Sequence, residues 1–162
     1  MKTILEEYTQ YNYWANKKIC DLLLTLDDSI LEKDIPSSFR TIKSTVYHIW
    51  GAEDLWHQRI NGDTTNKTIA KDFPGKFSDG INLFNEVSLK IIALVEKASD
   101  EDFLRVIDYK NMAGQPFSNN LYKIIMHCMN HSTFHRGQII TMLRNAGVTD
   151  LFSTDLITYY RI

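Results

Sequence analysis

The chain has 162 residues, of which 44% are hydrophobic and 23% are charged, a composition typical of globular proteins. Its 18 Lys and Arg residues stand against 20 Asp and Glu, which argues against a nucleic-acid partner and against a cationic membrane-binding face. With only 7 Gly and 3 Pro, the chain favours long helices over a turn-rich sandwich or barrel, and its length predicts one domain over residues 1–162.

The N-terminal segment contains Glu6 and Glu7, so it lacks the apolar run of a signal peptide. No stretch approaches the roughly 20 apolar residues of a membrane span. The two cysteines, Cys20 and Cys128, form no paired motif. We therefore expect a cytoplasmic protein with reduced thiols and no membrane partner.

The first expected helix has apolar residues at i, i+4 and i+7 spacing, which predicts one amphipathic face. These residues are Ile4, Tyr8, Tyr11, Ala15, Ile19 and Leu22. Acids, serines and Pro36 interrupt the pattern over residues 25–40. A second helix is expected over about 41–60, with Asn61-Gly62 as its stop.

Residues 62–77 are largely polar and predict a long loop, followed by a third helix over about 79–97. Residues 103–117 predict an extended segment or a small hairpin. A fourth helix is expected from a cap at Ser118 to Gly147, which can adopt the left-handed conformation after the last turn. Four long amphipathic segments predict an all-α, antiparallel four-helix bundle.

Three of the five histidines recur every four residues in the fourth helix: His127, His131 and His135. Each step drifts by only about 40° around the helix, so the three imidazoles form one row on one face. Two imidazoles one turn apart can reach a single metal ion at about 2.0–2.1 Å. His127 and His135 lie about 12 Å apart along the axis, too far for one ion. Spacing alone leaves the pairs His127/His131 and His131/His135 equally open.

A third ligand has to come from another helix, and His48 in the second helix is the candidate. Its face carries small residues that leave room for an ion and a bound ligand: Ser44, Thr45, Gly51 and Ala52. His57 lies about 180° further around the helix and is expected to point away. The alternative for such histidines is a solvated surface patch or a hydrogen-bonded core pair.

Three segments of the chain, in their order along the sequence, resemble the DinB/YfiT-like metalloprotein family, the DinB superfamily. They are Tyr11–Asn16, His48–Glu53 and Asn130–Gln138, and the last, with its His-Arg-Gly-Gln ending, is the most specific. The tail from Leu151 to Ile162 also resembles the family's ending. The resemblance covers essentially the whole chain.

The resemblance implies an up-down-down-up bundle with a long crossover between the second and third helices. It implies a three-histidine metal site, carried here onto His48, His131 and His135, and so selects His135 over His127. It also implies a homodimer and metal-dependent thiol chemistry. The known activities of the family and its relatives are transferases that use low-molecular-weight thiols and a thiol-dependent isomerase.

Three neutral imidazoles leave a divalent ion its full charge and open coordination positions, as in catalytic sites. Such an ion, for which imidazoles suit zinc, nickel or iron, can convert bound water or thiol into a nucleophile at neutral pH. The leading hypothesis is a metal-dependent transferase that uses a small thiol as cosubstrate. The alternatives are a metal-dependent hydrolase that uses metal-bound hydroxide and a non-catalytic metal- or ligand-binding protein.

Four further residues are candidates for supporting the ion or contacting the substrate: Glu53, His127, Arg136 and Gln138. Glu53 lies among apolar residues on a helix face that is expected to be buried. It either orients a ligand imidazole or is a structural carboxylate. Gln138, one turn beyond His135, either contacts a metal-bound ligand or makes a structural hydrogen bond. Arg136 either meets an anionic substrate or forms a structural ion pair.

Other notable residues have structural interpretations. Asn12, Trp14 and Asn16 are expected to lock the bundle, and Cys128 is expected to fill the core. The sequence contains no glycine-rich phosphate loop, no nucleophile elbow and no HExxH motif. These absences leave the histidines as the main functional indication.

Overall fold

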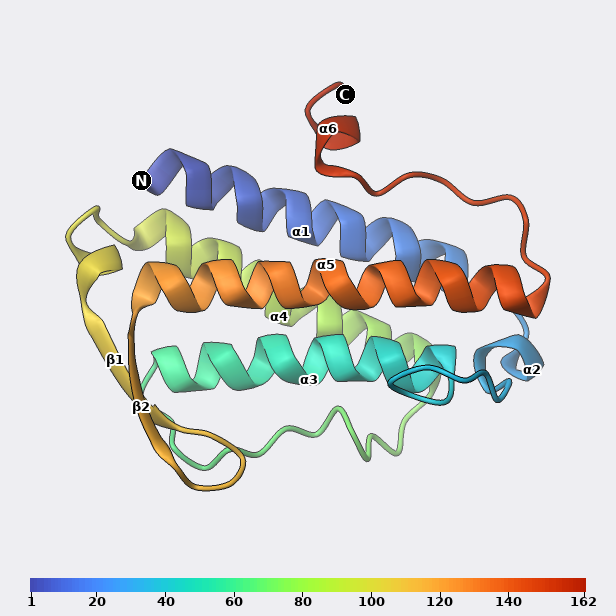
Figure 1. The fold of residues 1–162 in the computed structure, drawn as a ribbon, viewed down its shortest axis with the longest axis horizontal. Coiled ribbons are helices and arrows are strands. Elements are labelled where there is room, and N and C mark those ends of the chain that lie inside the picture. The colour runs from blue at the N-terminus through green and yellow to red at the C-terminus, as the bar shows by residue number, and fades with distance from the viewer.

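Four long helices lie side by side in the computed structural model, which describes residues 1–162 (Figure 1). They are α1 (Lys2–Leu23), α3 (Ile42–Ile60), α4 (Phe77–Lys97) and α5 (Leu121–Ala146). Helices α1 and α5 run in one direction, and α3 and α4 run in the other. The predicted up-down-down-up bundle is therefore confirmed, with residues 61–76 as the long crossover between α3 and α4.

Five short elements complete the chain: α2 (Asp28–Leu31), the 3-10 turn η1 (Asp102–Leu104), β1 (Val106–Lys110), β2 (Pro116–Asn120) and α6 (Leu156–Tyr159). Strands β1 and β2 pair antiparallel as a hairpin at one end of the bundle. The small hairpin that the sequence left open against an extended segment is thus present. No helix is both long enough and apolar enough to cross a membrane.

The start of α5 differs from the expected cap at Ser118. That residue lies in β2, opposite Asp108, and its Oγ donates a 2.6 Å hydrogen bond to the Asp108 carboxylate. The cross-strand pairing continues to Asn120, which is the residue before the first helical turn. The far end of α5 agrees with the prediction, since Gly147 adopts a left-handed φ of +97°.

Helix α3 begins at a capping box. The Thr41 Oγ1 accepts a 3.0 Å hydrogen bond from the Ser44 amide, and the Ser44 Oγ accepts a 3.1 Å bond from the Thr41 amide. Helix α3 packs against both α4 and α5, and α1 packs against the same two helices. These contacts bring the middle of α3 against the middle of α5.

A carboxylate lies at the centre of the bundle. Glu53 of α3 is fully buried, and its Oε1 accepts hydrogen bonds from Asn12 Nδ2 (2.7 Å), Asn16 Nδ2 (2.8 Å) and Ser132 Oγ (2.9 Å). Its Oε2 accepts a 2.5 Å bond from Ser88 Oγ. The donors come from α1, α4 and α5, so this one side chain connects all four long helices.

Arg136 balances the charge of this carboxylate indirectly. Its Nη1 donates to the Oδ1 atoms of Asn12 (2.5 Å) and Asn16 (2.7 Å), and its Nη2 donates to Thr133 Oγ1 (2.7 Å). Each asparagine therefore donates to Glu53 and accepts from Arg136. These bonds agree with the expectation that Asn12 and Asn16 lock the bundle, and we call the whole set the Glu53–Arg136 network.

Candidate metal centre

The structure brings His48, His131 and His135 together between α3 and α5. The Nε2 of His131 lies 3.0 Å from Nε2 of His48 and 3.2 Å from Nε2 of His135. Ligand nitrogens from all three rings fall within 4.8 Å of one another. Two ligands of a tetrahedral ion at about 2.0–2.1 Å are about 3.3 Å apart. The three imidazoles therefore fit one divalent ion bound through Nε2 atoms.

His127, the fourth histidine of interest, lies outside this cluster. Its exposed ring is centred 6.0 Å from the ring of His131 and packs edge-on against Trp56 at 5.4 Å. Between the two pairs that spacing left open, the structure places His135, not His127, beside His48. The reason is tertiary, because the packing of α3 on α5 decides which turn faces His48.

Burial keeps the three imidazoles neutral. It lowers the pKa of His48 to about 4 and that of His131 to about 4, and the neighbouring His135 contributes in both cases. It also lowers the pKa of His135. A neutral imidazole has a free lone pair and is the form that binds a metal ion. At pH 7 the cluster is therefore in its metal-binding form.

Gln138 orients one member of the cluster. The Nδ1–H of His135 donates a 2.7 Å hydrogen bond to Gln138 Oε1, which leaves the lone pair of His135 on Nε2. The amide of Gln138 in turn donates to Ser38 Oγ at 2.9 Å. Of the two roles considered for Gln138, the structure shows a structural hydrogen bond, and its partner is a candidate ligand imidazole. The buried Nδ1 of His131 has no hydrogen-bond partner within the chain.

Phe39 covers one side of the cluster. Its ring is centred 4.2 Å from the ring of His48 and 5.7 Å from that of His135. Phe39 and Ser38 belong to the irregular segment between α2 and α3, where no apolar periodicity is present. Sequence reasoning missed both residues for that reason, and no local pattern would have revealed them.

A cavity of about 850 Å³ opens beside His48, between α3 and the crossover. Its walls are largely aromatic and apolar, and they include Phe39, Tyr47, Ala52, Trp56, Phe73 and Met112. Gly51 also lines it, where a Cβ would meet Thr68 and Ala70 of the crossover at 3.3 Å. Gly51 thus allows the crossover to pack closely, and Ser44 and Ala52, two of the other small residues noted around His48, line the cavity. The volume suits a small organic ligand.

The remaining sequence candidates lie in the core. Glu53 and Arg136 make their hydrogen bonds within the Glu53–Arg136 network, and neither bonds to an imidazole. These contacts favour the structural interpretation of both residues. Cys20 and Cys128 are buried, and burial raises the pKa of both thiols. Both cysteines are therefore protonated at pH 7, and Cys128 fills the core.

Fold and site together define a class: an up-down-down-up bundle with three histidines from its second and fourth long helices. A sequence model of the DinB family matches residues 1–160, and the chain belongs to that family. Protein DinB of Bacillus subtilis strain 168 is 26% identical over 145 residues, which cover 85% of this chain and 83% of that protein.

Two solved structures share the fold. A DinB-like protein from Bacillus cereus ATCC 10987 has a TM-score of 0.67 at 22% identity, covering 89% of this chain and 91% of its own. YfiT from Bacillus subtilis has a TM-score of 0.69 at 16% identity, covering 92% and 91%. YfiT is described as a probable metal-dependent hydrolase with an unusual four-helix bundle topology.

Proposed function

We propose that the protein binds one divalent metal ion through His48, His131 and His135 and acts as a metal-dependent enzyme. The observation that carries this proposal is the convergence of three neutral imidazoles, with Nε2 atoms 3.0 and 3.2 Å apart. Zinc, nickel and iron all accept such a ligand set. Three protein ligands leave a coordination position open, as catalytic sites require.

The reaction that we propose is transfer of a low-molecular-weight thiol to an organic electrophile. A bound divalent ion supplies a lowered pKa to a coordinated thiol or water. The chain's own thiols are buried and protonated, so the sulfur nucleophile has to come from a cosubstrate. We place this reaction in the cytoplasm, where small thiols stay reduced.

The chain contributes binding and exclusion of water. The aromatic walls of the cavity beside His48, among them Trp56 and Phe73, suit an electrophile with an apolar body. Phe39 shields His48 and His135 from solvent on one side. In the transfer, a carbon–sulfur bond forms, the leaving group departs with its bonding electrons, and the thiol proton passes to solvent.

Hydrolysis is the second candidate, and the description of YfiT favours it. The same cavity would hold an ester or amide, and water would replace the thiol as nucleophile. The two reactions differ in one requirement, because only the transferase needs a thiol for turnover.

The test uses protein purified without a histidine tag and loaded with zinc, nickel or iron. It is assayed with cysteine and an aryl halide, and separately with an ester and amide panel. Thiol-dependent turnover in the wild type that is lost in His131→Ala supports the transferase, whereas thiol-independent hydrolysis supports the second candidate. Metal binding without either activity would leave a binding protein. Equal metal content in the wild type and His135→Ala would overturn the ligand set.

We also propose a homodimer, which the family resemblance implies. Helix α5 exposes two large apolar side chains, Met126 (50% exposed) and Phe134 (60% exposed), which an interface would cover. Light scattering should give about twice the 18.9 kDa mass of the chain. A strictly monomeric species would remove the dimer.

A further inference from the structure

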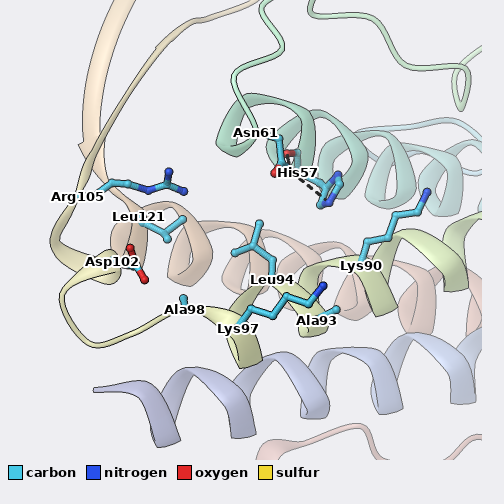
Figure 2. A pocket seen from close by; sticks show the side chains of 10 residues that line it. All are labelled: His57, Asn61, Lys90, Ala93, Leu94, Lys97, Ala98, Asp102, Arg105 and Leu121. Atoms are coloured by element: carbon cyan, nitrogen blue, oxygen red, sulfur yellow. Dashed lines mark hydrogen bonds between the residues drawn. The ribbon is translucent and has the colours of Figure 1, made fainter.

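A second cavity, of about 440 Å³, opens between the C-terminal ends of α3 and α4 (Figure 2). Its walls include His57, Asn61, Lys90, Leu94, Lys97 and Arg105. His57 follows His48 by nine residues on α3, so the two imidazoles point to opposite sides of that helix. One side faces α5 and the metal centre, and the other faces α4 and this second cavity.

Three cations line the second cavity, and one carboxylate lies among them. Lys90, Lys97 and Arg105 take part in none of the chain's ion pairs. The one carboxylate in the wall, Asp102, accepts 2.8 Å hydrogen bonds from both the amide and the Oγ of Ser99. Three cations less one carboxylate leave two positive charges here, although the whole chain carries a formal charge of −2.

The wall of the second cavity also contains apolar side chains. Lys90 and Lys97 are seven residues apart, so they share a face of α4 about 10.5 Å apart along its axis. Leu94 lies between them, and Arg105 reaches in from the other side of the cavity (Figure 2). Leu121, at the start of α5, is a further apolar wall residue. The cavity therefore combines a cationic rim with an apolar base.

Helix stabilisation accounts for only one of the three cations. A cation in the last turn of a helix interacts favourably with the helix dipole, and this explains Lys97 at the end of α4. The effect falls off within one turn, so it does not extend to Lys90, two turns earlier. Arg105 follows η1 and precedes β1, outside any α-helix. The presence of Lys90 and Arg105 in the wall of this cavity therefore has no helix-stabilising explanation.

We propose that this cavity binds a small organic phosphate, with a phosphate monoester head and a short apolar body. A phosphate monoester carries about −1.5 to −2 charges at pH 7, which matches the two uncompensated positive charges, whereas a carboxylate would neutralise only one. Guanidinium and ammonium groups donate charge-assisted hydrogen bonds to several phosphate oxygens at once. The apolar base around Leu94 accepts the body of the ligand, and the volume suits a small molecule.

Binding of phenyl phosphate tests the proposal. It is measured by calorimetry and by the histidine and amide resonances in NMR spectra. The resonances of His57 and Leu94 should shift. The double variant Lys97→Gln/Arg105→Gln should bind at least about tenfold more weakly, the loss expected for one charge-assisted hydrogen bond. The matched control is Arg144→Gln, which also removes an exposed cation from the last turn of a long helix and should bind within about twofold of the wild type.

Two further arms separate the possible outcomes. Inorganic phosphate should compete with phenyl phosphate, and phenylacetate should bind much more weakly; equally tight phenylacetate binding would overturn the assignment of a phosphate head. Binding should be unchanged in His131→Ala, which removes a proposed metal ligand and so separates this site from the metal centre. The proposal fails if the double variant binds as tightly as Arg144→Gln, or if the shifts centre on α5 near the histidine cluster.

Discussion

Glu53 and Arg136 stand on the same two helices as the three-histidine cluster, α3 and α5, and almost all polar atoms of their network are paired within the chain, with Arg136 Nε as the exception. Glu53 accepts four hydrogen bonds and Arg136 donates three, all shared with other side chains. The cluster instead brings ring nitrogens of three neutral imidazoles within 4.8 Å of one another, and the buried Nδ1 of His131 has no partner in the chain. A polar core whose groups mostly bond to one another is structural, whereas a cluster of neutral imidazoles with few partners in the chain is a candidate binding site.

The two regions are also coupled by sequence position. Ser132 and Arg136 belong to the network, and each directly follows a histidine of the cluster. Neighbouring helical residues point about 100° apart, so fixing Ser132 and Arg136 in the core also fixes the direction of His131 and His135. The network therefore sets the rotation of α5 that presents the two imidazoles to His48.

Glu53→Ala should produce the largest effect on stability. The substitution leaves Arg136 buried without its compensating charge, which costs about 3–5 kcal/mol of unfolding free energy. Urea denaturation measures the loss. The control, Glu86→Ala, removes an exposed carboxylate of α4 and should change stability by no more than about 0.5 kcal/mol. Equal losses in the two variants would show that the Glu53–Arg136 network does not stabilise the fold.

Removal of the metal tests the three-histidine cluster. An ion present at about 1,000 times its dissociation constant stabilises the fold by about 4 kcal/mol, so a chelator should lower Tm by roughly 10 °C. His131→Ala should show no response to the chelator. The measurement is a thermal melt by circular dichroism, with and without chelator. If the variant responds like the wild type, the ion is bound elsewhere.

The long helices could be predicted because their apolar periodicity is local information. The expected helix over 41–60 corresponds to Ile42–Ile60, and the left-handed conformation of Gly147 was expected from its place after the last turn. The start of α5 was misplaced at Ser118 because its contact with Asp108 depends on strand pairing across the hairpin. Pairing of that kind leaves no periodic pattern near the helix.

The candidate metal site could also be predicted only as far as local helical spacing allows. Helical spacing places His131 beside either His127 or His135, and the packing of α3 on α5, with the family resemblance, is what distinguishes them. The stripe on α3 indicated that Glu53 is buried, but its partners come from three other helices. Phe39 reaches the cluster from an irregular segment. Long-range contacts, which composition and spacing do not encode, supplied each missing part.

Gln138→Leu should weaken the cluster without disturbing the network. The variant removes the acceptor for His135 Nδ1–H, and loss of such a partner lowers metal affinity by about 10–100-fold. Competition with a colorimetric chelator measures the affinity. Gln138→Glu keeps an acceptor oxygen at this position and should restore most of it. Equal affinity in the wild type and Gln138→Leu would show that the hydrogen bond does not support the ion.

Phe39→Ala should have the smallest effect, and it separates substrate binding from metal binding. Phe39 lines the cavity, and an aromatic contact with a bound electrophile is worth about 0.5–1.5 kcal/mol, so KM for an apolar electrophile should rise by roughly two- to tenfold. Metal content should not change, because Phe39 supplies no ligand atom. Phe117→Ala, which removes an exposed aromatic ring from β2, is the matched control and should leave KM unaltered. A fall in metal content instead of a rise in KM would assign Phe39 to the stability of the cluster rather than to the cavity beside it.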